Sequence, residues 1–180
     1  SHPLGDIAAC VGGDLRVDGP AVHGIALSTA GVRPGDLFVA AAGASTHGAR
    51  YAADALAAGA VAVLTDPVGA ELVDEGAPLI VVADPRGVLG RLSAWFYDHP
   101  ASALKTIGVT GTQGKTSTTF LIDAALGERS SGLIGSMGSK IDGAPVPTKL
   151  TTPEAPALHA LLAKMREEGV TWVSSEVSSQ

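Results

Sequence analysis

The chain has 180 residues, of which 46% are hydrophobic and 17% are charged, and its formal net charge is −6. This composition predicts a folded globular protein and excludes a coiled coil or a largely disordered chain. The acidic balance also argues against general nucleic-acid binding, which needs a basic surface. A small anionic ligand would have to be held locally, by backbone N–H groups and a few cations.

The cellular compartment is suggested by what the sequence lacks. Cys10 is the single cysteine, which excludes an intrachain disulfide and fits a reducing compartment. No apolar run reaches the roughly 18 residues that a membrane helix needs. The first ten residues lack the basic and apolar regions of a signal peptide. We therefore expect a cytoplasmic monomer that binds neither membranes nor nucleic acids.

Strands and helices alternate through the first hundred residues, and this predicts an α/β domain with a mainly parallel sheet. The last of these helices ends before Pro100, and apolar residues recur along it at helical spacing from Val88 to Phe96. The expected elements are a strand at 36–43, an alanine-rich helix at 48–60, strands at 61–66 and 79–84, and the helix before Pro100.

A polar connector at 98–105 precedes a second α/β pattern, so we expect two domains, 1–100 and 101–180. The second is expected to begin a parallel α/β domain of the P-loop type. With only three such strands it would be unfinished, which predicts a piece of a longer polypeptide. Its expected elements are strands at 106–110, 131–136 and 170–179, helices at 115–126 and 154–169, and a hairpin turn at Asp142-Gly143.

The stretch GVTGTQGKTSTT, residues 108–119, is the strongest functional signal because a strand leads into it and a helix leaves it. Its glycines, Gly108, Gly111 and Gly114, allow a tight turn whose N–H groups point at an anion. The helix that starts near Lys115 adds the positive end of its dipole. Lys115 would neutralise the β and γ phosphates of a nucleotide, and the hydroxyl of Thr116 would bind Mg²⁺.

The loop departs from the strict phosphate-binding pattern at one position. Val109 stands where that pattern has glycine, and Gly108 comes one place early, but the Gly-Lys-Thr core is intact. A glycine turn without a ligand is the minor alternative.

Three further segments each have a structural and a functional interpretation. Thr151 and Thr152 precede Pro153 and Glu154, which is typical of a helix N-terminus, so capping is preferred for them on chemistry alone. Glu176 is equally well explained as a Mg²⁺ ligand beyond the end of a strand or as a solvent-facing residue on an edge strand. The small polar loop 44–47 could offer amides to an anion, although a capping or surface role is preferred for its histidine.

These motifs occur together in one family. GDLFVA, THGARY, GVTGTQGKTSTT, LTTPEAP and EVSS, in this order, closely resemble the Mur ligases of peptidoglycan synthesis. The resemblance covers nearly the whole chain. The phosphate loop is common to the superfamily, whereas GDLFVA and LTTPEAP resemble the branch that adds the third residue of the peptide. The resemblance implies that residues 1–100 form a UDP-substrate-binding domain and that residues 101–180 form the first part of an ATP-binding domain. This 180-residue piece would be inactive by itself.

The resemblance implies an ATP-dependent ligase that uses Mg²⁺. It would join a diamino acid, expected to be meso-diaminopimelate, to a UDP-N-acetylmuramoyl dipeptide through an acyl phosphate. A P-loop kinase, a nucleotide switch and a non-catalytic binding module are the alternatives. The implied residues are Lys115 and Glu176 for catalysis; Gly111, Thr112, Gln113, Gly114, Lys115, Thr116 and Ser117 for ATP; Thr116 and Glu176 for the metal; and Leu27, Thr29, Ala44, Ser45, Thr46, His47, Thr151, Thr152 and Ser178 for the UDP-linked substrate.

The chain departs from the family pattern at three places. Ser28-Thr29-Ala30 stands where the family has Asp-Ser-Arg, and this concerns the contacts to uridine. Gln113 replaces the usual Asn or Ser of the loop. Gln180 replaces a histidine that supplies chemistry in the family, which keeps the binding-module alternative open.

Overall fold

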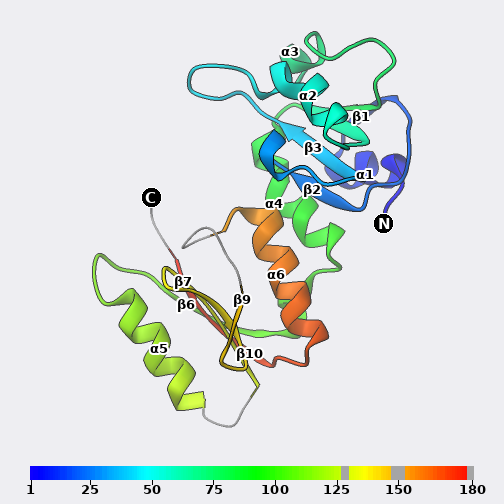
Figure 1. Cartoon of the computed structure of the whole chain (residues 1–180). Helices are drawn as coiled ribbons and strands as arrows, with labels where there is room; N and C mark the ends of the chain where they lie inside the picture. Colours follow the sequence, from blue (N-terminus) through cyan, green and yellow to red (C-terminus); the bar gives the residue numbers. More distant parts are fainter. Residues whose placement is uncertain (127–129, 147–152, 178–180) are drawn as a thin grey trace. The chain divides into compact units, whose positions relative to one another are not determined.

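The computed structural model describes residues 1–126, 130–146 and 153–177. The chain forms two compact units, Ser1–Phe96 and Tyr97–Gln180. Each unit contains one five-stranded sheet with helices packed against it, so the predicted α/β class is confirmed (Figure 1). Among the described residues, none of the helices has the length and apolar character needed to cross a membrane.

The sheet of the first unit has the strand order β1-β5-β4-β3-β2. Strands β2 to β5 are parallel, and β1 pairs with β5 in the antiparallel direction. The elements are α1 (Leu4–Val11), β1 (Asp14–Val17), β2 (Gly24–Ala26), η1 (Thr29–Gly31), β3 (Asp36–Ala40), η2 (Gly48–Tyr51), α2 (Ala52–Ala57), β4 (Ala62–Thr65), α3 (Pro67–Ala70), β5 (Leu79–Val81) and α4 (Pro85–Phe96).

Every residue of β3 and β4 is buried, and successive side chains point to opposite faces, so the first sheet has two apolar faces. Helices α2 and α3 cover one face, and α1 and α4, which contact each other, lie on the other side of the sheet (Figure 1). Because small alanines line α2, the helix can approach the strands closely. The core on the α2 side contains Phe38, Ala40, Ala49, Ala52, Ala55, Ala60, Val63, Leu79 and Val81.

The first unit differs from the sequence prediction in several elements. The segment expected as a helix at 48–60 begins with a 3-10 turn, and its α-helix ends at Ala57, ahead of Gly59 with φ +114°. Helices α1 and α3 and strands β1 and β2 were not predicted. These elements have three to eight residues each, which is too short for a clear hydrophobic period.

The second unit has the strand order β6-β10-β7-β8-β9. Strands β6, β10 and β7 are parallel, and β8 and β9 add an antiparallel meander that was expected only as one hairpin turn. That turn is confirmed, with positive φ at both Asp142 and Gly143. The elements are η3 (Pro100–Ala103), β6 (Lys105–Val109), α5 (Lys115–Leu126), β7 (Ser131–Gly135), β8 (Gly138–Ile141), β9 (Ala144–Val146), α6 (Ala155–Glu167) and β10 (Trp172–Glu176).

Neighbouring residues of the central strand β10 point to opposite faces of this sheet. Val173 packs in a core with α6, whereas the hydroxyl of Ser174 donates to the carbonyl of Thr119 in α5 at 3.4 Å. The two helices therefore cover opposite faces (Figure 1). Since β6, β7 and β10 are parallel, their carboxyl ends meet at one edge of the sheet, where α/β proteins bind ligands.

Candidate functional site

The phosphate-type loop leaves the carboxyl end of β6 and enters α5 at Lys115, as predicted. Gly111 has φ +146° and Gly114 has φ +79°, conformations that favour glycine, so the loop depends on both residues. Gly108 was grouped with them from the sequence, and that is wrong, because it lies inside β6. There a β-carbon would meet a methyl group of Val177 at 3.2 Å.

The side chain of Lys115 lies back across this loop. Its ammonium donates a hydrogen bond to the carbonyl of Gly111 at 2.8 Å. Thr112, Gln113, Gly114 and Ser117 are exposed to solvent, so the predicted nucleotide-binding residues form an accessible surface. An ammonium group beside an exposed glycine loop, at the start of a twelve-residue helix, is well suited to binding phosphate groups.

Glu176 lies at the carboxyl end of β10, beside this loop. Its side chain is buried, with 1% of the residue exposed, and β10 is the second strand of the sheet from the β6 edge. The alternative of a solvent-facing glutamate on an edge strand is therefore wrong. The amide of Ser136 donates to the Glu176 carboxylate at 3.1 Å, and the Ser136 hydroxyl donates to its two oxygens at 3.2 and 3.3 Å.

Ser136 also connects Glu176 to the phosphate-type loop. The hydroxyl oxygens of Thr116 and Ser136 are 3.0 Å apart. The two residues that the sequence assigns to a metal therefore converge through one serine, which sequence reasoning missed. The only available signal was a hydroxyl residue directly after the apolar run Ser131–Gly135.

The donor chemistry of this cluster suits Mg²⁺. A hydroxyl and a carboxylate are hard oxygen ligands, and Mg²⁺ usually takes few protein ligands and several from phosphate groups and water. Gly135 leaves room for the carboxylate, because a β-carbon there would collide with Glu176. Within the described ranges, no cluster of three or more His, Cys, Asp or Glu side chains could form an all-protein metal cage.

The predicted substrate residues Thr151, Thr152 and Ser178, and also Gln180, lie outside the described residues. The capping interpretation of the threonine pair can still be judged from the helix that follows. That helix begins at Ala155, with Glu154 at the N-cap and Pro156 in the first turn. The N-cap is therefore Glu154 and not a threonine, so the capping interpretation of the threonine pair is wrong.

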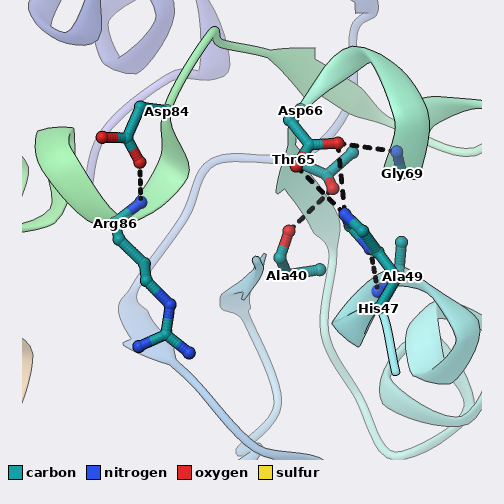
Figure 2. Close-up of polar contacts among 8 residues, drawn as sticks. All are labelled: Ala40, His47, Ala49, Thr65, Asp66, Gly69, Asp84 and Arg86. Carbon is teal, nitrogen blue, oxygen red and sulfur yellow. Dashed lines mark hydrogen bonds and ion pairs between the residues drawn. The ribbon is translucent and has the colours of Figure 1, made fainter. Parts of the chain in front are cut away.

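Figure 2 shows how the first unit holds the loop that contains His47. The amide of Ala49 donates to Nδ1 of His47 at 3.1 Å, so Nδ1 carries a lone pair and the proton is on Nε2. Nε2 donates to the two carboxylate oxygens of Asp66 at 3.1 and 3.0 Å. His47 is thus the N-cap of η2, as the preferred interpretation had it, and it also joins the loops after β3 and β4.

Asp66 accepts hydrogen bonds from two residues of the same cluster, Gly69 and His47. Burial alone would raise the pKa of Asp66, but hydrogen bonds from the Gly69 amide and from His47 outweigh it and lower the pKa. The Gly69 amide bond is 2.8 Å long. Thr65 donates to the carbonyl of Ala40 at 2.7 Å and fastens the ends of β4 and β3 together (Figure 2).

The other predicted substrate residues lie near the same edge of the first sheet. Leu27 and Thr29 follow β2, and the loop 44–47 follows the parallel strand β3. Ala44 and Ser45 are exposed, and the Gly43 amide donates to the carbonyl of Thr46 at 2.9 Å, which closes a tight turn. Asp84 caps the start of α4 at this edge by accepting the Arg86 amide at 3.1 Å (Figure 2).

Two family models match the chain. Residues 21–97 match the catalytic domain of the Mur ligase family, and residues 109–180 match the Mur ligase middle domain. Two relatives are similar along nearly the whole chain. UDP-N-acetylmuramoyl-L-alanyl-D-glutamate–2,6-diaminopimelate ligase of Streptomyces avermitilis is 47% identical over 98% of the chain. UDP-N-acetylmuramyl-tripeptide synthetase of Leifsonia xyli subsp. xyli is 48% identical over 100%.

A solved structure of a UDP-N-acetylmuramoyl-L-alanyl-D-glutamate–2,6-diaminopimelate ligase has the same fold, with a TM-score of 0.66 and 29% identity over 88% of this chain. The chain spans about a third of the length of these proteins, namely 35% and 36% of the two relatives and 32% of the solved chain. Family models matching both units, and relatives almost half identical along the whole chain, agree with the resemblance read from the motifs: the chain belongs to the Mur ligase family.

Proposed function

We propose that this chain supplies the UDP-substrate-binding domain and the start of the ATP-binding domain of a ligase in peptidoglycan synthesis. The enzyme adds a third residue, meso-diaminopimelate, to UDP-N-acetylmuramoyl-L-alanyl-D-glutamate. The observation that carries the proposal is the convergence of Thr116 and Glu176 on Ser136 at the carboxyl edge of the second sheet, next to the loop that Lys115 contacts. The names of the relatives support the choice of substrates. We also propose that the enzyme is cytoplasmic and monomeric.

The reaction has two chemical steps. A carboxylate oxygen of the D-glutamyl group attacks the γ-phosphorus of ATP, and the bond to the β,γ-bridging oxygen breaks, which gives an acyl phosphate and ADP. The amino group of the diamino acid then attacks the acyl carbon, phosphate leaves, and the nitrogen loses a proton. Phosphoryl transfer depends mainly on positioning and charge stabilisation.

The residues of this chain would supply those two effects. The amides of 111–117 would hold the phosphates at the start of α5, and Lys115 would exchange its bond to the Gly111 carbonyl for the β and γ phosphates. Thr116 and Glu176 would hold Mg²⁺, which neutralises phosphate charge when bound. In the first unit, Leu27, Thr29 and the loop 44–47 are proposed to contact the uridine part, with Thr151, Thr152 and Ser178 facing the muramoyl peptide.

We propose that His47 orders the loop 44–47 and is not itself a main ligand contact. Both of its ring nitrogens already have partners, Ala49 and Asp66, so its main contribution is to fix the loop that presents Ala44, Ser45 and Thr46. Contacts to a ligand would then come from the amides and hydroxyls of that loop.

The test is phosphate release from ATP by the complete polypeptide that carries this chain. Parallel reactions contain UDP-N-acetylmuramoyl-L-alanyl-D-glutamate with meso-diaminopimelate, with L-lysine, or with neither. The expected result is release that needs the UDP-peptide and meso-diaminopimelate. Release with L-lysine instead would change the amino acid but keep the ligase. Release that ignores both substrates would favour a kinase or switch, and no release from folded protein would favour a binding module.

A further inference from the structure

Ser136 lies in a turn whose geometry is fixed by the sheet. Ser136 and Met137 are the two central residues of the hairpin between β7 and β8, and the flanking residues Gly135 and Gly138 are paired. Two-residue hairpin loops have few allowed conformations. The serine is therefore held at the carboxyl end of β7, next to the end of β10 and opposite the start of α5.

The hydrogen bonds around Ser136 have one consistent direction. A serine hydroxyl has a single proton, and the one on Ser136 points to the carboxyl group of Glu176, at 3.2 and 3.3 Å from its two oxygens. In the 3.0 Å contact with Thr116, Ser136 must then accept, and Thr116 donates. The proton of Thr116 is thus turned toward Ser136, and its oxygen can face a cation with lone pairs only.

We infer that Ser136 is a positioning residue for the nucleotide-bound metal: its amide and hydroxyl hold the Glu176 carboxylate, and its oxygen sets the direction of the Thr116 hydroxyl. Both groups then present oxygen lone pairs to the same cation. This inference rests on the proposed function. Ser136 is not assigned any contact with the reacting atoms.

The competing explanation is that Ser136 serves stability alone. A buried carboxylate needs hydrogen bonds, and the amide of Ser136 supplies one whatever its side chain. The two explanations differ in metal dependence, because only a positioning role links the hydroxyl of Ser136 to the affinity for Mg²⁺.

The test uses the complete polypeptide and two hydroxyl-free variants, Ser136→Ala and Ser136→Gly, so that one remains if the other does not fold. Ser136→Thr restores the hydroxyl. Ser130→Ala is the matched control, since Ser130 donates to the Asp142 carboxylate at 2.8 and 3.0 Å from the opposite end of β7. Binding of ADP is measured by calorimetry over a range of Mg²⁺ concentrations, and kcat and KM are measured at saturating Mg²⁺.

The hydroxyl-free variants are expected to need roughly tenfold to a hundredfold more Mg²⁺ for half-maximal gain in ADP affinity, as for other residues that orient metal ligands. Their ADP affinity without Mg²⁺ and their KM for the UDP-peptide should stay unchanged. Ser136→Thr should recover most of the loss, and Ser130→Ala should match the unaltered protein.

A lowered melting temperature with normal Mg²⁺ dependence would overturn the inference and leave Ser136 a structural residue. A different result would contradict the proposed function and not only the role of Ser136. If the unaltered protein binds ADP without any effect of Mg²⁺, or does not bind ADP, the proposed function itself fails.

Discussion

The imidazole of His47 and the carboxylate of Asp66 are 3.0 Å apart, and this pair joins the loops that follow two neighbouring parallel strands, β3 and β4. The side chains are 12% and 17% exposed, so solvent screens the pair only in part. Because Nδ1 of His47 caps η2 at the same time, one ring fixes the exit of β3, the start of η2 and the exit of β4.

The first prediction concerns this pair. His47→Ala and Asp66→Ala should each lower the free energy of unfolding by about 1–3 kcal/mol, since each leaves a largely buried polar partner behind. The double variant should lose about 1 kcal/mol less than the sum of the two, because the second substitution has no bond left to break. Urea unfolding of all four proteins measures the coupling. Strictly additive losses would show that the contact contributes nothing to stability.

The second prediction concerns Gly135. Gly135→Ala places a methyl group against the Glu176 carboxylate and should lower stability by roughly 1–3 kcal/mol, the usual cost of overpacking. Gly90→Ala in α4 is the control, because a β-carbon there meets no atom within 4 Å. That substitution should stabilise the protein by about 0.5–1 kcal/mol. Equal effects of the two substitutions on the unfolding midpoint would contradict the close approach at Gly135.

The third prediction concerns Lys115. Lys115→Ala in the complete polypeptide should lower ATP-dependent turnover by about 10²–10³-fold, corresponding to the roughly 3–4 kcal/mol typical of a lost electrostatic donor. Stability should change little, since the bond to Gly111 lies at the surface. Lys164→Ala, on the exposed side of α6, is the matched control and should keep full activity. Unchanged phosphate release by Lys115→Ala would remove the lysine from the mechanism.

The fourth prediction concerns pH and His159 on α6. Among the described residues, Nδ1 of His159 is a buried side-chain atom without a hydrogen-bond partner. Burial, and then the nearby His99, lowers the pKa of His159 in the folded protein. The folded state therefore takes up a proton less readily than the unfolded state, so this residue reduces stability as the pH falls below its unfolded pKa of about 6.5.

His159→Leu removes both effects. It should raise the free energy of unfolding by about 1 kcal/mol at pH 7.5, because an unsatisfied buried group disappears. The gain should grow as the pH falls to about 5.5. Urea unfolding at the two pH values tests this prediction. A gain that shrinks on acidification would mean that the charged form of His159 stabilises the folded protein.

Local patterns predicted the parts of this structure that depend on near neighbours. Gly111, Gly114, Lys115 and Thr116 lie within one loop and one helical turn, so their sequence spacing was enough to place them. The Asp142-Gly143 turn is likewise decided by the backbone conformations that these two residues tolerate.

Other features depend on strand order, which no local pattern contains. Strand β1 pairs with β5 through contacts such as Leu15 with Ile80, and its four residues give no strong period. Glu176 is buried because β10 lies between β6 and β7, and Ser136 meets it from the turn after β7. Asp66 could not be named as the partner of His47 for the same reason, since β4 had first to be placed beside β3.

The place of β10 in the second sheet has a consequence for how this unit forms during synthesis. Strands β6 and β7 are made first, but they pair with each other only through β10, whose Trp172 lies opposite Lys105 and Ser131. Until the ribosome has released residue 176, both strands have unpaired edges, and such edges invite aggregation. The loop at 110–114 is therefore translated long before the sheet that positions it has folded. Nucleotide binding should begin only after β10 has inserted between β6 and β7.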